Sequence, residues 1–288
     1  MSPNVLITGA SGYLGGSLLE KIHEEGLPPH GKLYALVRKE TDAAEVKKRG
    51  AFSLSFDVKD SAAVRKNIVE NNISVVFFLI DAMSSNSQVL FIEALAEVKR
   101  NTGKEVHFLH AVTTNCTVIE EAEKYGVRNG RGLGFGNKIS IQTVDIIKAA
   151  LSSNHVYKID TENSVWPVSH VADTSALYKQ ILSSILAGNL PDSGRNGYYL
   201  ASSGLVDWND IYSAIASALY KRRVIADSEV RLADAETVRK MAEGVGCQPQ
   251  LIGFKIAGLC TLQAKNGEKL GWKSKFDSHH ILEAADDE

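Results

Sequence analysis

The fold is decided by the stretch Val5-Leu6-Ile7-Thr8-Gly9-Ala10-Ser11-Gly12-Tyr13-Leu14-Gly15. Its first part, Val5–Thr8, is a short apolar run typical of a buried strand, and a cluster of glycines ends it. Apolar residues then recur at helical spacing from Leu14 to Glu25. The predicted order is therefore strand, tight loop, helix.

The glycines of this loop have three different roles. Gly9 permits a tight turn, Gly12 lets the main chain approach a diphosphate without an intervening Cβ, and Gly15 lets the helix pack close to the sheet. The start of the helix offers unpaired N–H groups and a partial positive charge to phosphates. We therefore expect this loop to bind a dinucleotide, through Gly9, Ser11, Gly12, Tyr13, Leu14 and Gly15.

Two alternatives compete with this interpretation of the loop. A phosphate loop for ATP or GTP is excluded, because no Gly-Lys-Ser or Gly-Lys-Thr follows the glycines. A tight structural turn without any ligand is the other alternative, and the strand-loop-helix context argues against it.

The alternation of strands and helices continues through the first half of the chain. Strands separated by helices pair in parallel through right-handed crossovers. The predicted fold class is α/β, a doubly wound parallel sheet of the Rossmann type covered on both faces. The predicted strands are Leu33–Val37, Leu54–Phe56, Val75–Ile80 and Val106–Leu109, and the predicted helices are Ala62–Val69, Val89–Val98 and Val118–Tyr125.

The second half of the chain has a different pattern. Amphipathic helices are predicted at Ile139–Leu151, Ala176–Leu186 and Trp208–Leu219, with only short apolar runs between them. This pattern predicts a smaller mixed C-terminal region. We place the dinucleotide-binding domain at residues 1–138 and the substrate-side region, interleaved with the sheet, at residues 139–288.

The end of the second predicted strand indicates which dinucleotide binds. An NAD site usually has an acid there for the ribose hydroxyls, but this sequence reads Val37-Arg38-Lys39-Glu40. The Arg38 guanidinium can pair with the 2′-phosphate of NADP and stack on the adenine. We therefore favour NADP(H) over NAD(H). The alternative is that Arg38 is a solvated base beside Glu40.

The next two strand ends supply further candidate residues. Asp57 and Val58 follow the third predicted strand, where a carboxylate and a backbone N–H can meet the adenine edge, although Asp57 could instead cap the helix before Ser61. Leu79 and Ile80 end the fourth predicted strand and should line the floor under the ribose and nicotinamide.

Composition and charge exclude several classes of protein. The chain has 288 residues, of which 44% are hydrophobic and 23% charged, as in an ordinary globular protein. Its 32 basic and 34 acidic residues give a net charge of −2, and no basic stretch favours nucleic acid. The longest apolar runs are too short to cross a membrane, and no signal peptide is evident. We expect a cytosolic protein with reduced thiols at Cys116, Cys247 and Cys260.

Metal binding is not expected. His107 and His110 are three residues apart on a predicted strand, so their rings point to opposite faces. His279 and His280 have no acidic or cysteine partner at the spacing that metal ligands need.

The glycine loop, the base after the second strand, Asp57-Val58 and the segment Trp166-Pro167-Val168-Ser169-His170-Val171-Ala172-Asp173 resemble the extended short-chain dehydrogenase/reductase family, including its NAD-dependent epimerase/dehydratase branch. Leu270-Gly271-Trp272 is also similar to the family's C-terminal pattern. The resemblance implies that Asp173 caps a helix at Thr174 and that His170 lies near the substrate cleft, with a structural hydrogen bond as its expected role. It also implies a small organic substrate and allows a homodimer.

The family's proton relay, a Tyr-x-x-x-Lys pair on a helix, is absent from this sequence. In that pair the tyrosine exchanges a proton, and the lysine one turn away lowers its pKa. No tyrosine here has a lysine four positions later, so the catalytic residues stay unknown. The tyrosines are Tyr13, Tyr34, Tyr125, Tyr157, Tyr178, Tyr198, Tyr199, Tyr212 and Tyr220.

Two junctions indicate why the relay is missing. After Ala111, where the family carries a serine loop and its catalytic helix, Val112 leads directly into a different helical pattern. After Arg128, where a buried strand should follow, the run Asn129–Gly136 is too rich in glycine to form one. We infer that internal segments are omitted near 111/112 and 128/129, as in a shortened form of the chain.

Two functions follow from the resemblance. The first is an NADP(H)-dependent oxidoreductase or an epimerase/dehydratase-like enzyme acting on a small carbonyl or alcohol substrate. The alternative is a catalytically inactive protein that kept the dinucleotide site and acts as a sensor or binds a partner.

Overall fold

Residues 2–80, 85–111 and 127–286 are described by the structure, which is a computed structural model. The chain divides into two units, which are described one at a time. Unit 1 consists of Met1–Thr117, Gly132–Lys138 and Tyr178–Pro191, and unit 2 consists of Val118–Arg131, Ile139–Leu177 and Asp192–Glu288.

Unit 1 is built on a five-stranded parallel sheet with the strand order β3-β2-β1-β4-β5. From β1 the chain first builds outward through β2 and β3 and then returns to place β4 on the other side of β1. The order therefore reverses between β1 and β4, which is where open α/β sheets bind their ligands. The strands are β1 (Asn4–Ile7), β2 (Leu33–Leu36), β3 (Phe52–Leu54), β4 (Ile73–Phe78) and β5 (His107–His110).

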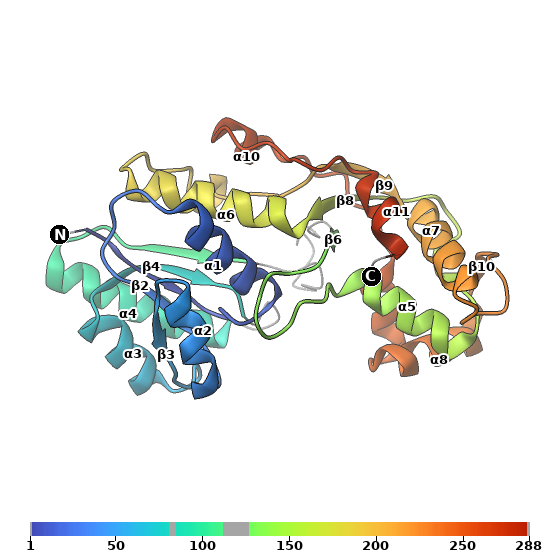
Figure 1. Ribbon diagram of the computed structural model, residues 1–288, viewed down its shortest axis with the longest axis horizontal. Helices are drawn as coiled ribbons and strands as arrows, with labels where there is room; N and C mark the ends of the chain where they lie inside the picture. The colour runs from blue at the N-terminus through green and yellow to red at the C-terminus, as the bar shows by residue number, and fades with distance from the viewer. Residues whose placement is uncertain (1, 81–84, 112–126, 287–288) are drawn as a thin grey trace. The chain divides into compact units, whose positions relative to one another are not determined.

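Helices cover both faces of this sheet, because successive strand residues point to opposite sides. Val76 and Phe78 pack with α3 and α4 in one apolar cluster, whereas the Phe77 ring lies 6.2 Å from the ring of Tyr178 in α6. Figure 1 shows α1 on the side of the sheet opposite to α3 and α4. The helices are α1 (Tyr13–Glu25), α2 (Ala43–Lys48), α3 (Ser61–Glu70), α4 (Asn86–Thr102) and α6 (Val171–Leu186), of which only the part from Tyr178 onward belongs to unit 1.

These observations confirm the predicted doubly wound α/β fold class. One strand lies elsewhere than predicted: β3 is Phe52–Leu54 and not Leu54–Phe56. The reason is pairing, since β2 ends at Leu36 and the partner of Leu36 is Leu54. The helix predicted at Val118–Tyr125 lies outside the described residues.

Unit 2 contains two small sheets. In the three-stranded sheet, β8 pairs in parallel with β6 and antiparallel with β9, and a second sheet joins β7 and β10. The strands are β6 (Val127–Asn129), β7 (Tyr157–Lys158), β8 (Val165–His170), β9 (Gly204–Asp207) and β10 (Arg231–Leu232). The helices are α5 (Gln142–Ser153), α7 (Trp208–Lys221), α8 (Ala235–Val245), α9 (Ile252–Ile256), α10 (Lys265–Lys269) and α11 (His280–Glu283).

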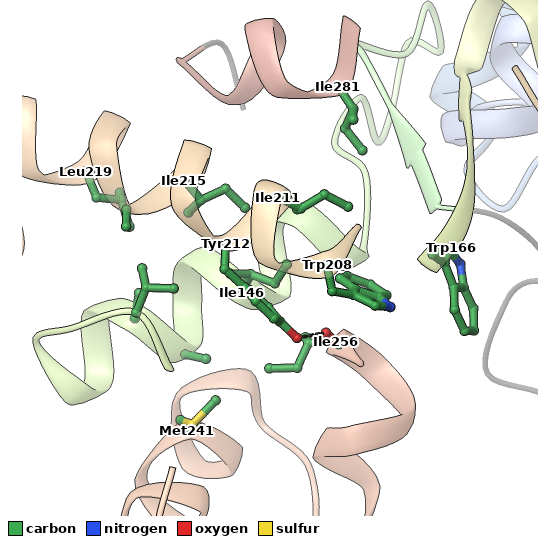
Figure 2. Packing of buried hydrophobic residues seen from close by; sticks show 14 of the residues in the cluster. Ile146, Trp166, Trp208, Ile211, Tyr212, Ile215, Leu219, Met241, Ile256 and Ile281 are labelled. Atoms are coloured by element: carbon green, nitrogen blue, oxygen red, sulfur yellow. Dashed lines mark hydrogen bonds between the residues drawn. The ribbon is translucent and has the colours of Figure 1, made fainter. Parts of the chain in front are cut away.

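The core of unit 2 gathers apolar side chains from its helices and from β8. Trp208 and Tyr212 of α7 face Ile146 of α5 and Ile256 of α9 in this core (Figure 2). The Tyr212 hydroxyl donates to the Ile256 carbonyl oxygen, and burial raises the pKa of Tyr212 far above its usual value. The tyrosine is therefore a structural residue that stays protonated.

The predicted break at Arg128–Asn129 falls inside β6. Arg128 pairs with Ser169 and Asn129 with His170 in regular register, so the expectation that Asn129 begins a non-strand run is wrong by one residue. Pairing with β8 stabilises this residue in a strand, and Gly130, with a φ of 86°, ends the strand immediately afterwards. The omission of internal segments stays a prediction.

Candidate dinucleotide-binding site

The glycine loop forms a tight turn between β1 and α1. Gly9 has a φ of 63°, a conformation that favours glycine, and the Gly12 N–H donates to the Gly9 carbonyl oxygen at 2.9 Å. Helix α1 begins at Tyr13, with Gly12 as its N-cap residue. Because Gly12 has no side chain, the cap supplies no acceptor to the N–H groups of the first turn, which can then face a ligand.

The three glycines differ in how much free space lies at their Cβ positions, as expected for a loop that binds a phosphate. A Cβ on Gly15 would collide with Gly9 and lie 2.9 Å from the Thr8 carbonyl oxygen, and a Cβ on Gly9 would lie 2.9 Å from Cγ2 of Ile80. A Cβ on Gly12, by contrast, would meet only the Gly9 carbonyl oxygen, at 3.2 Å, within the described residues. The Gly12 position is therefore open to an approaching group, whereas Gly9 and Gly15 are closed by packing.

The end of β4 lies beside this turn. The Leu79 N–H donates to Oγ1 of Thr8 at 2.9 Å, and a Cβ on Gly9 would lie 3.3 Å from the Leu79 carbonyl oxygen. Leu79 and Ile80 are both half-buried. These contacts bring the two residues next to the glycine loop, as a floor for the dinucleotide requires. Asp81, which follows them, lies outside the described residues.

Arg38 lies just beyond the end of β2, on the other side of the loop. The Ala10 N–H donates to the Leu36 carbonyl oxygen at 3.2 Å, which joins the glycine loop to the last residue of this strand. Val37 is buried, whereas Arg38 and Lys39 are both exposed. Two cationic side chains thus extend into solvent from the strand end that adjoins the loop.

Asp57 and Val58 follow β3 at the same edge of the sheet. The Asp57 carboxylate is exposed and accepts a hydrogen bond from the Lys59 N–H at 2.9 Å. The alternative role of Asp57 as a helix cap is wrong, because Asp60 caps α3 by accepting from the N–H groups of Ala62 and Ala63. Asp60 directly precedes the helix, whereas Asp57 is too early in the chain to cap it.

A second glycine-rich segment, Gly132–Lys138, lies against the glycine loop inside unit 1. The Gly136 N–H donates to the Ser11 carbonyl oxygen at 2.8 Å. The sequence shows these glycines, but no helix begins directly after them, and this favours a flexible loop. The signal that points to the contact is their alternation at 132, 134 and 136, which places three residues without Cβ on one side of an extended chain.

The His170–Asp173 segment belongs to unit 2. The His170 Nδ1 accepts from the Ala172 N–H at 3.1 Å, a structural hydrogen bond, and the ring stacks on Phe276 with centroids 3.9 Å apart. Asp173 does not cap a helix at Thr174, because α6 already begins at Val171. Its buried carboxylate instead accepts from the N–H groups of Lys275 and Phe276, at 2.9 and 3.1 Å.

The expectations on metal binding, membrane spans and cysteines can be compared with the structure only within the described residues. Within residues 2–80, 85–111 and 127–286 there is no cluster of three or more His, Cys, Asp or Glu side chains that could hold a metal ion. In the same ranges, no helix combines the length and apolar character that a membrane span needs. Cys247 is a free thiol, Cys260 is buried, and Cys116 lies outside the described residues.

The doubly wound sheet, with its glycine loop at the point where the strand order reverses, defines an α/β protein of the Rossmann type. Residues 5–129 match the model of the NAD dependent epimerase/dehydratase family. This match lies within the dinucleotide-binding half of the chain and agrees with the resemblance found in the sequence. A comparison with curated protein sequences gives no match.

Solved structures with the same fold cover nearly the whole chain. The UDP-glucose 4-epimerase of Bifidobacterium longum, in complex with NAD+ and UDP, is 14% identical, has a TM-score of 0.62, and the match covers 98% of this chain and 97% of that one. The Thermus thermophilus UDP-glucose 4-epimerase, in complex with NAD, is 16% identical, with a TM-score of 0.59 over 99% and 98% of the two chains. The triphenylmethane reductase of Citrobacter sp., complexed with NADP(H), is 12% identical, with a TM-score of 0.59 over 98% and 99%.

Proposed function

We propose that the protein is an NADP(H)-dependent oxidoreductase or epimerase/dehydratase that acts on a small organic carbonyl or alcohol substrate. The observation that carries this proposal is the difference among the three loop glycines: Gly9 and Gly15 are closed by packing, whereas Gly12 is open to a ligand. A Cβ would make one tight contact at Gly12, 3.2 Å from the Gly9 carbonyl oxygen, so packing within the turn explains the glycine there less fully than at positions 9 and 15.

The residues of this chain fit a nicotinamide dinucleotide as follows. The N–H groups at the start of α1 would hold the diphosphate, and the positive end of the helix dipole would stabilise its charge. Asp57 and Val58 would meet the adenine, and Leu79 and Ile80 would lie under the ribose and nicotinamide. When bound, the dinucleotide supplies a group that accepts or donates a hydride.

The preference for NADP(H) rests on the β2 end. Arg38 and Lys39 are exposed there, and the position lacks the carboxylate that would bind the ribose hydroxyls of NAD and repel a 2′-phosphate. The solved structures include complexes with NAD and with NADP(H), so the likeness of fold leaves this choice to the local residues. We also propose a cytosolic location and a homodimer.

A second candidate function is favoured by one observation, the missing Tyr-x-x-x-Lys relay. A protein that kept the dinucleotide site and lost the proton relay would bind NADP(H) and respond to it as a sensor or partner-binding protein. Both candidates predict binding. They differ in turnover: a reductase would lower the absorbance of NADPH with a carbonyl substrate, an epimerase or dehydratase would convert its substrate with no net change in the dinucleotide, and a sensor would do neither.

The direct test of the site is Gly12→Val, with binding of NADP+ measured by calorimetry. The valine side chain would occupy the open position in front of Gly12, so we expect binding to be abolished while the fold is kept. Gly253→Val is the matched control, because Gly253 lies in α9 of unit 2 with no described atom within 4 Å of its Cβ position. Unchanged affinity in Gly12→Val would refute the assignment of the loop.

A further inference from the structure

The Gly132–Lys138 segment, which we call the strap, belongs to unit 1 although the chain on both sides of it, Val118–Arg131 and Ile139–Leu177, belongs to unit 2. The Gly132 N–H donates to the Lys138 carbonyl oxygen at 2.9 Å and closes the strap into a loop. Its position against the glycine loop is therefore held by local contacts within unit 1.

Three alternate glycines face the glycine loop. A Cβ on Gly132 would lie 2.6 Å from the ring of Tyr13, and a Cβ on Gly134 or on Gly136 would lie 2.8 Å from the Ser11 carbonyl oxygen. Gly132 and Gly134 are buried, whereas the side chain of Leu133 between them is 48% exposed. The strap can thus approach the loop only because every second residue has no side chain.

Two hydrogen bonds attach the strap to the loop and to the first turn of α1. The Gly136 N–H donates to the Ser11 carbonyl oxygen, and the Leu133 N–H donates to Oγ of Ser17 at 2.9 Å. The buried Ser17 hydroxyl in turn donates to the Tyr13 carbonyl oxygen at 2.6 Å. These bonds fix the carbonyl groups of the turn from one side.

A third contact comes from Phe135. The Arg49 guanidinium lies 5.0 Å from the centre of the Phe135 ring and is held by ion pairs with Glu20 of α1 at 2.5 Å and Glu45 of α2 at 2.9 Å. The outward side of the strap is therefore anchored to the helices that flank the site.

The strap leaves the phosphate side of the loop open. Its close contacts are with the carbonyl oxygens of Ser11 and Gly12 and with Gly16, whereas the Cβ direction of Gly12 meets no strap atom within 4 Å. A diphosphate that approaches Gly12 does not have to displace the strap.

We propose that the strap is a positioning element of the dinucleotide site, an inference that rests on the proposed function. It holds the Ser11–Tyr13 turn in the geometry that presents its N–H groups to the diphosphate. Because coupling between two binding events is reciprocal, the dinucleotide also holds the strap in place.

Binding measurements with Gly134→Ala and Ser17→Ala test this proposal. The first variant puts a Cβ against backbone oxygens and the second removes the hydroxyl that receives the Leu133 N–H, so we expect NADP+ affinity to fall about tenfold and about threefold, respectively. The controls are Gly253→Ala, in open space, and Ser153→Ala, whose hydroxyl likewise donates to a carbonyl one turn earlier. Both controls should bind NADP+ like the unchanged protein.

Binding of a second ligand distinguishes a loss of loop positioning from a general structural defect. The nucleotide 2′-AMP reaches the Arg38 side of the site but has no diphosphate, so its affinity should stay the same in all four variants. An equal loss of 2′-AMP and NADP+ affinity would overturn the proposal, because the defect would then be structural. Unchanged NADP+ affinity in Gly134→Ala would also overturn it, and increased affinity would show that the strap competes with the dinucleotide.

Trypsin digestion probes the strap directly, because Arg131 precedes it, Lys138 is its last residue, and both are exposed. NADP+ should slow cleavage at these two positions in the unchanged protein but not in Gly134→Ala, and without ligand Gly134→Ala should be cut faster than Gly253→Ala. NADP+ binding without any protection would overturn the strap proposal alone. Failure of the unchanged protein to bind NADP+ would instead overturn the proposed function, and the ligand-free digest would still report whether the strap is docked.

Discussion

Arg38 is the single residue on which the proposed preference for NADP(H) depends. Arg38→Asp would place a carboxylate where the 2′-phosphate lies, so NADP+ affinity should fall by about tenfold to one hundredfold while NAD+ affinity changes little. Titration of both dinucleotides checks this. Arg239→Asp, an exposed arginine of α8 in unit 2, serves as the control for net charge. Equal losses for the two dinucleotides would contradict the assignment.

His170 makes the stability of unit 2 depend on pH. Burial holds the pKa of His170 below its usual value and the neighbouring His280 lowers it further, while Asp173 opposes the shift. The unfolded chain therefore binds the extra proton more readily. The stabilisation that neutral His170 gives to the folded state is therefore fully present above about pH 6.5, the usual histidine pKa. It is lost as the pH falls through the lower pKa that His170 has in the folded protein.

His170→Asn tests this dependence, because its amide oxygen can accept the Ala172 N–H without titrating. Urea unfolding can be followed by tryptophan fluorescence, since all three tryptophans, Trp166, Trp208 and Trp272, are buried in unit 2. Between pH 7.5 and 5.5 the unchanged protein should lose more stability than His170→Asn. Equal losses would show that another group titrates.

Single residues also show how far the sequence predicts the site. The separate roles of Gly9, Gly12 and Gly15 follow from their spacing after one strand, because that spacing fixes the turn. The role of Asp57 could not be decided from sequence, since Asp57 and Asp60 both precede a helix and only the actual start of α3 shows which one caps it. The strap contacts depend on tertiary packing between residues about 120 positions apart, which local patterns do not report.

At the scale of elements, the start of α6 is joined to the C-terminal segment through Asp173. The Trp272 Nε1–H donates to the Asp173 backbone carbonyl oxygen, and the Asp173 carboxylate accepts two backbone N–H groups. Asp173→Ala would remove the buried carboxylate that accepts the N–H groups of Lys275 and Phe276, and it should lower the free energy of unfolding by about 2 kcal/mol. Asp173→Asn, which keeps one acceptor oxygen, should lose less in the same fluorescence assay, and an equal loss would contradict this.

Element boundaries were predictable within two residues for α1 and α7, where one apolar pattern covers the whole element, but α4 extends beyond the predicted Val89–Val98 at both ends. The prediction started α6 at Ala176, whereas the helix begins at Val171, because His170-Val171-Ala172 has no helix-start signal of its own. The small strands β7 and β10 have two residues each, and their pairing depends on neighbours distant in the chain. Two residues are too few to show the alternation of apolar and polar residues by which a strand is recognised in a sequence.

At the scale of the whole molecule, the chain lacks the family's proton relay but carries its dinucleotide loop. If internal segments are omitted near 111/112 and 128/129, the protein isolated from its natural source should have an intact mass well above 31.3 kDa. Mass spectrometry decides this. A mass of 31.3 kDa would show that the relay is truly missing and would favour the sensor over the enzyme.

The most direct test of the central claim is a crystal structure of the protein with NADP+ bound. The diphosphate should lie within hydrogen-bonding distance, about 2.7–3.2 Å, of backbone N–H groups at residues 12–14, beside the Gly12 position that no side chain fills. The strap should keep its contacts with Ser11 and Ser17 in that structure. A dinucleotide bound elsewhere, with the first turn of α1 free of phosphate, would contradict the assignment of this corner of the fold.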